Sequence, residues 1–245
     1  MVAKARVRPV IDEFNLPIGA TIARKYEVVS KLGSGWEGEV YKVCELKTGI
    51  ERAAKLFYPH RNIRNRSATF YAKKLHKLRH CPVLIHYHTD ETIRRGGQDI
   101  TVLVSEYVEG ELLSAFLKRF PGNRLTPFQG LHLLYAMTKG MEPIHLLNEY
   151  HGDLHAENII VNRYGLEFDL KLLDMFHWSG SKLENRQEDI CDLVRIFYDV
   201  LGGQKRYRNH PSTVKFICAG LRKSLILKRF RTMSQLREHL ELLKW

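Results

Sequence analysis

The feature that most constrains this sequence is a polar run at residues 151–158, His-Gly-Asp-Leu-His-Ala-Glu-Asn, with a further aspartate at position 174. Asp153 and Asn158 lie in one loop and Asp174 follows the next predicted hairpin, so three oxygen-bearing side chains come together. Mg²⁺ accepts carboxylate and amide oxygens alongside the phosphates of a substrate. We expect Asn158 and Asp174 to hold a metal ion and Asp153 to face a reacting hydroxyl group. The alternative, an Asp- and Asn-rich loop that only makes turns, is disfavoured by the presence of all three groups in order.

A glycine-rich segment at residues 32–40, Leu-Gly-Ser-Gly-Trp-Glu-Gly-Glu-Val, lies between two predicted strands. A dinucleotide-binding fingerprint needs a helix after its glycines, and here a strand follows. A glycine-rich hairpin lets backbone amides approach phosphate oxygens with no side chain in the way. The segment alone fits a flexible hairpin equally well, and the residues concerned are Gly33, Gly35 and Gly38.

Lys55 lies on the next predicted strand, between Ala54 and Leu56. A single lysine on a strand is usually a solvated edge residue. Because this one follows a glycine-rich hairpin, it becomes a candidate for holding the α- and β-phosphates of a nucleotide.

Hydrophobic spacing divides the chain into a strand-rich first part and a helical second part. Residues before about Pro17 are expected to form a loosely attached tail, and Ser67 is expected to cap the first helix. Thr126 and Pro127 form a typical helix start. Strands are predicted at residues 26–32, 39–46, 53–57 and 100–107, a hairpin at 158–162 and 169–173, and helices at 67–78, 128–144 and 189–201, with two more helical stretches after them.

Composition excludes several classes of protein. Hydrophobic residues make up 44% and charged residues 27% of the chain, a balance that argues against disorder. No run of 18 apolar residues occurs, so no membrane-spanning helix is expected. The N-terminal residues are basic but no apolar core segment follows them, so no secretory signal is expected. The four cysteines have no CxxC spacing, which argues against a zinc site or a disulfide framework. A reducing, cytoplasmic compartment fits these observations best.

The formal net charge of +12 is concentrated in two segments. Residues 52–89 and residues 200–237 contain Lys and Arg but no Asp or Glu. Two interpretations stay open. The segments are either solvated basic faces or docking surfaces for a polyanionic partner such as nucleic acid or an acidic protein.

The order of these parts, a glycine loop, a strand lysine, a catalytic loop and a metal-binding aspartate, resembles the protein kinase superfamily over nearly the whole chain. Residues 104–110, Val-Ser-Glu-Tyr-Val-Glu-Gly, are similar to the family's hinge, and residues 189–202 resemble the central helix of its large lobe. The resemblance implies an α+β, bilobal, protein-kinase-like fold. It has a tail at residues 1–18, a small antiparallel-sheet lobe at 19–105, a hinge at 106–110 and a mainly helical lobe at 111–245.

The resemblance also implies a set of site residues. Asp153 would orient the acceptor hydroxyl and take its proton, with Lys55 and His155 as the other catalytic residues. Mg²⁺ would be bound by Asn158 and Asp174. The nucleotide-binding residues would be Gly33, Gly35, Gly38, Val40, Ala53, Lys55, Glu106 and Val108, the last two through their backbone.

The sequence departs from the family pattern in three places. The family pairs its strand lysine with a Glu on the first helix, and that position falls on Tyr71, so Lys55 needs another counter-ion. The catalytic loop has His-Gly-Asp-Leu-His where His-Arg-Asp-Leu-Lys is usual, which is closer to aminoglycoside, choline and atypical kinases. Only 14 residues separate Asp174 from Asp189, so the activation segment is expected to be short. The candidate counter-ions are Glu37, Glu39 and Asp174.

The sequence therefore predicts an ATP- and Mg²⁺-dependent phosphotransferase, foremost a minimal serine/threonine protein kinase of bacterial type. One alternative is a small-molecule kinase, which the His-Gly-Asp-Leu-His loop favours. The other is a nucleotide-binding pseudokinase that acts as a scaffold for a polyanionic partner, which Tyr71 in the glutamate position favours.

Overall fold

The computed structural model describes residues 10–176 and 180–243. The chain divides into two compact units. The first comprises the described parts of Met1–Arg79 and Ile85–Val108, and the second those of His80–Leu84 and Glu109–Trp245. No helix among the described residues is both long enough and apolar enough to cross a membrane.

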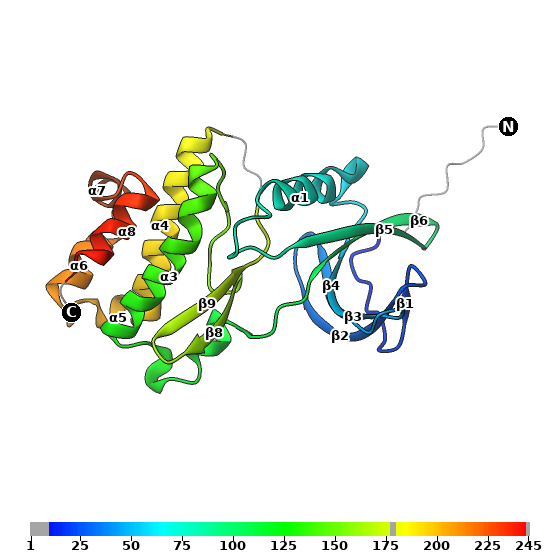
Figure 1. Cartoon of the computed structure of the whole chain (residues 1–245), viewed down its shortest axis with the longest axis horizontal. Helices are drawn as coiled ribbons and strands as arrows, with labels where there is room; N and C mark the ends of the chain where they lie inside the picture. The colour runs from blue at the N-terminus through cyan, green and yellow to red at the C-terminus, as the bar shows by residue number, and fades with distance from the viewer. Residues whose placement is uncertain (1–9, 177–179, 244–245) are drawn as a thin grey trace. The chain divides into compact units, whose positions relative to one another are not determined.

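The first unit is built on a six-stranded antiparallel sheet with strand order β1-β2-β3-β4-β6-β5 (Figure 1). Its strands are β1 Thr21–Ile22, β2 Tyr26–Ser34, β3 Gly38–Glu45, β4 Glu51–Phe57, β5 Tyr87–Arg95 and β6 Gln98–Glu106. The three strands expected at the start of the chain and the strand expected at residues 100–107 are confirmed, with bounds that differ by no more than two residues at either end.

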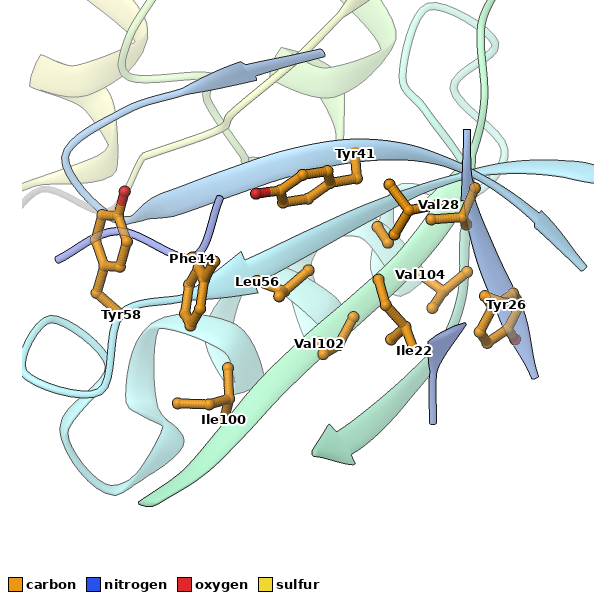
Figure 2. Close-up of a cluster of buried hydrophobic side chains, with 12 residues drawn as sticks. Phe14, Ile22, Tyr26, Val28, Tyr41, Leu56, Tyr58, Ile100, Val102 and Val104 are labelled. Atoms are coloured by element: carbon orange, nitrogen blue, oxygen red, sulfur yellow. The ribbon is translucent and has the colours of Figure 1, made fainter. Parts of the chain in front are cut away.

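Alternating side chains give this sheet two different faces. On one face, apolar side chains from five of the strands and from the N-terminal segment form a buried cluster (Figure 2). On the other face lie Val40, Ala53 and Lys55, which are only half-buried. The cluster consists of Phe14, Ile22, Tyr26, Val28, Tyr41, Val43, Ala54, Leu56, Tyr58, Ile100, Val102 and Val104.

The expectation of a loosely attached tail is wrong for the residues just before Pro17. Phe14 is 1% exposed and its ring stacks on Tyr58, with ring centroids 5.4 Å apart. The backbone amide of Leu16 donates to the hydroxyl of Tyr41 at 3.0 Å. Ile11 and Leu16 also pack against the same buried cluster, so apolar side chains and backbone hydrogen bonds together hold the segment on the sheet. Residues 1–9 lie outside the described part of the chain.

Helix α1 Arg66–Lys77 packs in the same unit, and the helix expected at residues 67–78 is confirmed. The expected cap is wrong, because the N-cap residue is Asn65 and Ser67 lies inside the helix. The side-chain oxygen of Asn62 accepts from the backbone amide of Ala68 at 3.2 Å and so satisfies one of the first-turn donors. A short 3₁₀ helix, Ile63–Asn65, precedes α1.

Strand β5 is absent from the expected list. Its side chains alternate between half-buried and exposed, and they are mostly polar, Tyr-His-Thr-Asp-Glu-Thr-Ile-Arg-Arg. A strand at the edge of a sheet needs little apolar surface, so hydrophobic spacing gives only a weak signal for it.

The second unit holds a three-stranded antiparallel sheet and most of the helices (Figure 1). The hairpin expected around Gly165 is confirmed as β8 and β9. The end of the chain is divided into more helices than the two expected. The strands are β7 Glu111–Leu112, β8 Ile159–Tyr164 and β9 Glu167–Leu172, and the α-helices are α2 Leu113–Leu117, α3 Pro127–Leu146, α4 Lys182–Val200, α5 Gly203–Tyr207, α6 Ser212–Cys218, α7 Lys223–Arg229 and α8 Met233–Glu241.

Helices α3 and α4 lie side by side at the centre of this unit (Figure 1). Helix α3 begins as expected, because the Thr126 hydroxyl accepts from the amide of Gln129 and the Gln129 side chain accepts from the amide of Thr126. Ser181 and Glu184 make the same reciprocal pair at the start of α4. Helix α4 therefore starts earlier than the expected residue 189.

Candidate active site

Lys55 has an acidic partner within its own unit. The ammonium group of Lys55 donates to the carboxylate of Glu37 at 3.0 Å, and the side chains are 11% and 25% exposed. Val40 lies opposite Lys55 across β3 and β4, and Ala53 lies two residues before it, so all three share one face of the sheet. A charge-assisted bond shielded to this degree is stronger than a surface ion pair. Glu37 is therefore the counter-ion that the first unit supplies.

Two aromatic rings flank the same ammonium group. The Nζ atom of Lys55 lies 5.3 Å from the ring centroid of Phe57 and 5.3 Å from that of Tyr71. Tyr71 is a buried residue of α1. The helix thus presents a π face to the lysine at the position where the resemblance implied a carboxylate.

Glu39 was the other glycine-loop candidate, and the structure assigns it elsewhere. Its side chain is 1% exposed and accepts from the backbone amides of Phe14 and Asn15, both at 3.1 Å. The Tyr41 hydroxyl donates to it and Lys31 pairs with it at 3.0 Å. Burial by itself raises the pKa of Glu39, but these hydrogen bonds together hold the pKa below its ordinary value. Glu39 holds the N-terminal segment on the sheet. A Lys55–Asp174 pair stays a prediction.

The glycine-rich segment forms a hairpin between two strands, as predicted. Gly33 lies in β2, Gly35 in the turn and Gly38 at the start of β3. A Cβ atom on Gly38 would lie 1.9 Å from the carbonyl oxygen of Leu56. Only glycine therefore allows the hairpin to approach β4 this closely. The carbonyl oxygen of Glu37 accepts from the amide of Tyr58 at 2.9 Å, which attaches the turn to the end of the same strand.

Glu106 and Val108 belong to the same unit as Lys55. Glu106 ends β6, opposite Arg52, and its amide donates to the carbonyl of His86 at 2.9 Å. Ser105 pairs with Ala53 one position away. All the residues expected to bind nucleotide thus lie in the first unit.

The residues of the polar run converge in the second unit. The amide group of Asn158 donates to the backbone carbonyl of Asp153 at 2.9 Å and to its carboxylate at 3.1 Å. The Nε2 atom of His155 lies 2.9 Å from the Asn158 amide nitrogen and 3.6 Å from the Asp153 carboxylate. The Asp153 side chain is 47% exposed, so a substrate hydroxyl could reach it. The loop holds one carboxylate in a fixed, accessible position.

Backbone hydrogen bonds of the residues on either side of Asp174 attach its segment to this loop. The amide of Leu173 donates to the carbonyl of Asn158, and the amide of Phe176 donates to that of His151, both at 2.9 Å. Asp174 has a φ of 50°, a left-handed conformation that is strained for a residue other than glycine. The segment that carries Asp174 is therefore fixed against the catalytic loop on both sides.

The residues here fit a magnesium ion. Asn158 turns its NH₂ group toward Asp153, which leaves its amide oxygen available as a ligand, and Asp174 would offer a carboxylate. Among the described residues no group of three or more His, Cys, Asp or Glu side chains could hold a metal ion by itself. Mg²⁺ typically binds one or two protein ligands together with substrate phosphates and water.

Asp189, a buried residue of α4, holds the start of the catalytic loop, a role that the sequence did not reveal. Its carboxylate is 0% exposed and accepts from the amides of His151 at 2.8 Å and Gly152 at 2.9 Å, while His145 Nε2 lies 3.0 Å away. Gly152 has a φ of 86°, which a glycine adopts without strain. A carboxylate in the apolar stripe of a predicted helix was the available signal, because such a group needs buried donors.

Asp192, one turn after Asp189, carries a perturbed carboxyl group. Burial, followed by the neighbouring charges of Asp189 and Glu188, raises the pKa of Asp192 to about 7 from 3.8. The native state thus keeps a proton that an unfolded chain loses near pH 4. Stability from this group is present at acidic pH and is lost as the pH rises through 7.

Replacing Asp192 by Asn should remove the loss of stability that occurs as the pH rises, because asparagine does not ionise. We expect D192N to raise the melting temperature by several degrees at pH 8 and by much less at pH 5, measured by calorimetry. Asp169, an exposed residue of β9, offers a matched control, and D169N should change neither value. An equal gain at both pH values would show that the carboxyl of Asp192 ionises normally.

Because only 14 residues separate Asp174 from Asp189, we expect that no phosphorylation in this segment is needed for activity, and Ser181 provides a test. Its hydroxyl accepts from the amide of Glu184 at 3.1 Å and caps α4, whereas Ser179, the other candidate, lies outside the described residues. We expect S181A to keep its activity and to lose about 0.5–2 kcal/mol of stability with the cap. Kinetic assays and denaturant unfolding measure these two quantities. Mass spectrometry that finds a phosphate on either serine, required for activity, would contradict the expectation.

Comparison with known protein families gives one match over most of the chain. The sequence model described as "Protein kinase domain" matches residues 26–203. In the solved structures, the kinase domain of PknI from Mycobacterium tuberculosis (a C20A, R136A double mutant) is similar, with a TM-score of 0.65 and 15% identity. The match covers 93% of this chain and 97% of that one. At this identity the likeness shows the fold alone.

Curated proteins are also similar to this chain. An Aurora kinase of Yarrowia lipolytica is 27% identical over 173 residues, 68% of this chain and 43% of that protein. Cyclin-dependent kinase C-2 C of Arabidopsis thaliana is 31% identical over 191 residues, 76% of this chain and 28% of that protein. Serine/threonine-protein kinase pkn2 of Myxococcus xanthus is 28% identical over 161 residues, 64% of this chain and 18% of that protein. The chain thus spans less than half the length of these relatives.

Proposed function

The chain belongs to the protein kinase family, and we propose that it transfers the γ-phosphoryl group of ATP, with Mg²⁺, to a serine or threonine hydroxyl of a protein. The observation that carries this proposal is the arrangement of Asp153, His155 and Asn158 in one loop, next to the segment that holds Asp174. Four of the curated relatives are named as serine/threonine or cyclin-dependent kinases, which favours a protein acceptor.

In the proposed reaction, Asp153 accepts a hydrogen bond from the acceptor hydroxyl and takes its proton as the new bond forms between that oxygen and the γ-phosphorus. The bond from the γ-phosphorus to the bridging oxygen breaks, and ADP leaves. Asn158 and Asp174 would hold Mg²⁺, which neutralises charge on the phosphates. Such chemistry consists mainly of positioning and charge stabilisation, so these few groups are sufficient.

In the same proposal the first unit binds the nucleotide. Lys55 holds the α- and β-phosphates, and the hairpin with Gly33, Gly35 and Gly38 covers them. Val40 and Ala53 contact the base, and the backbone of Glu106 and Val108 faces its edge. Residues 106–110 form the hinge between the two lobes.

His155 is proposed to act beside Asp153. It stands where protein kinases usually have a lysine, and its ring nitrogen lies 3.6 Å from the Asp153 carboxylate. A lysine carries a permanent charge at this position, whereas a histidine offers two ring nitrogens that can donate or accept a hydrogen bond.

The test is to incubate the purified protein with radiolabelled ATP, Mg²⁺ and a generic protein acceptor such as casein. We expect label on serine or threonine of the acceptor or of the protein itself. Label that appears only on a small-molecule alcohol offered in parallel would establish the small-molecule kinase that the His-Gly-Asp-Leu-His loop favours. Nucleotide binding without any transfer would establish the pseudokinase, which Tyr71 favours.

A polyanionic partner for the basic segments 52–89 and 200–237 stays a prediction. Affinity for nucleic acid that falls steeply between low and physiological salt would support it, because phosphate contacts release bound cations. Affinity that does not depend on salt would argue for solvated basic faces.

A further inference from the structure

We propose that Glu37 of the glycine-rich hairpin is the positioning residue for Lys55, and that it takes the place of the helix carboxylate that α1 does not carry. This inference rests on the proposed function, because it concerns how the nucleotide-binding lysine is held. All the groups involved belong to the first unit.

The first step of the argument is the chemistry around the ammonium group. Lys55 is 11% exposed on its side chain and is flanked by the rings of Phe57 and Tyr71. A buried charge is costly unless an opposite charge or a hydrogen-bond acceptor compensates it. The Glu37 carboxylate at 3.0 Å provides that compensation for the ammonium group that would bind phosphate. An ammonium carries three donors and can bind a carboxylate and phosphate oxygens together.

The second step is the origin of this carboxylate. Residues 52–89 contain no Asp or Glu, so α1 cannot supply one, and the only acid of β4, Glu51, pairs with Lys42 at 2.7 Å. The helix instead directs Tyr71 at the lysine. The acid comes from the hairpin between β2 and β3. Because β3 pairs with β4, Glu37 of this hairpin reaches Lys55 of β4.

The third step is the rigidity of the hairpin at this point. The carbonyl of Glu37 accepts from the amide of Tyr58 at 2.9 Å, and Gly38 lies so close to Leu56 that no Cβ fits between them. Glu37 is therefore attached to the chain that carries Lys55 at points one and three residues beyond it. A carboxylate held on a rigid hairpin fixes the position of the Lys55 ammonium group, whereas a carboxylate on a free loop tip would not. The hairpin that covers the phosphates and the lysine that binds them are thus placed as one piece.

The experiment measures Mg²⁺–ADP binding by calorimetry, and kcat and KM for ATP, in E37Q, in Y71E and in the double variant E37Q/Y71E. We expect E37Q to weaken nucleotide binding by about ten- to a hundredfold, the effect of losing one hydrogen bond between charged groups. Tyr71→Glu returns a carboxylate to the helix beside Lys55, so the double variant should recover most of the lost affinity. A loss of general stability would not be rescued in this way.

Glu27, an exposed residue of β2 in the same sheet, provides the matched control, and E27Q should bind like the wild type. Melting temperatures of all variants show whether each one folds, and E37D, which keeps the charge, should bind better than E37Q. Unchanged or tighter binding in E37Q, or no recovery in the double variant, would overturn the role of Glu37. If the wild type itself binds no nucleotide, the proposed function fails, which is a different result.

Discussion

Replacing Asp153 by Asn should lower phosphoryl transfer by about a hundred- to ten-thousandfold, the usual contribution of a general base. Asparagine has nearly the same shape as aspartate and keeps the position of the loop, but it cannot take the proton of the acceptor hydroxyl. Affinity for Mg²⁺–ATP should not fall, because Asp153 is proposed to contact the acceptor. Initial rates with radiolabelled ATP and nucleotide binding by calorimetry measure the two effects separately.

The exposed Asp169 of β9 gives a matched control in the same unit, and D169N should retain full activity. Wild-type turnover in D153N would remove Asp153 from the proposed role. Loss of nucleotide binding together with turnover would instead assign Asp153 to the metal site.

Replacing the buried Asp189 by Ala should have the largest effect on stability and should also abolish activity. The substitution leaves the amides of His151 and Gly152 without their acceptor inside the protein, and His145 without its partner. Breaking a buried charged network of this kind costs about 3–5 kcal/mol. Because these amides begin the loop that carries Asp153, the residual folded protein should also lose kcat. Denaturant unfolding and assays below the melting temperature measure the two losses.

Asp199 lies on the same helix, and burial raises the pKa of its carboxyl, so its charge does not stabilise the fold. D199A should therefore lose no stability and should keep its activity. If D189A loses no more stability than D199A, the hydrogen bonds of Asp189 do not hold the loop.

The protein-kinase-like α+β fold was predictable because it depends on the order of motifs along the chain. The glycine segment, Lys55, the run at 151–158 and Asp174 occur in one order, and local signals such as the Thr126 cap locate the elements between them. These signals act over a few residues and do not require knowledge of distant contacts. The same reasoning missed β5 and the attachment of Phe14, since each depends on a partner strand far away in sequence.

The sequence by itself determined that the helix after Lys55 carries no acid and that an aspartate, a histidine and an asparagine share one loop. Only the tertiary structure decided which distant group pairs with each of these side chains. Glu37 and Glu39 are both glycine-loop acids two residues apart, yet one pairs with Lys55 and the other binds the N-terminal segment. Charge and spacing cannot distinguish them, because the choice depends on which face of the sheet each carboxylate reaches and on the donors buried there.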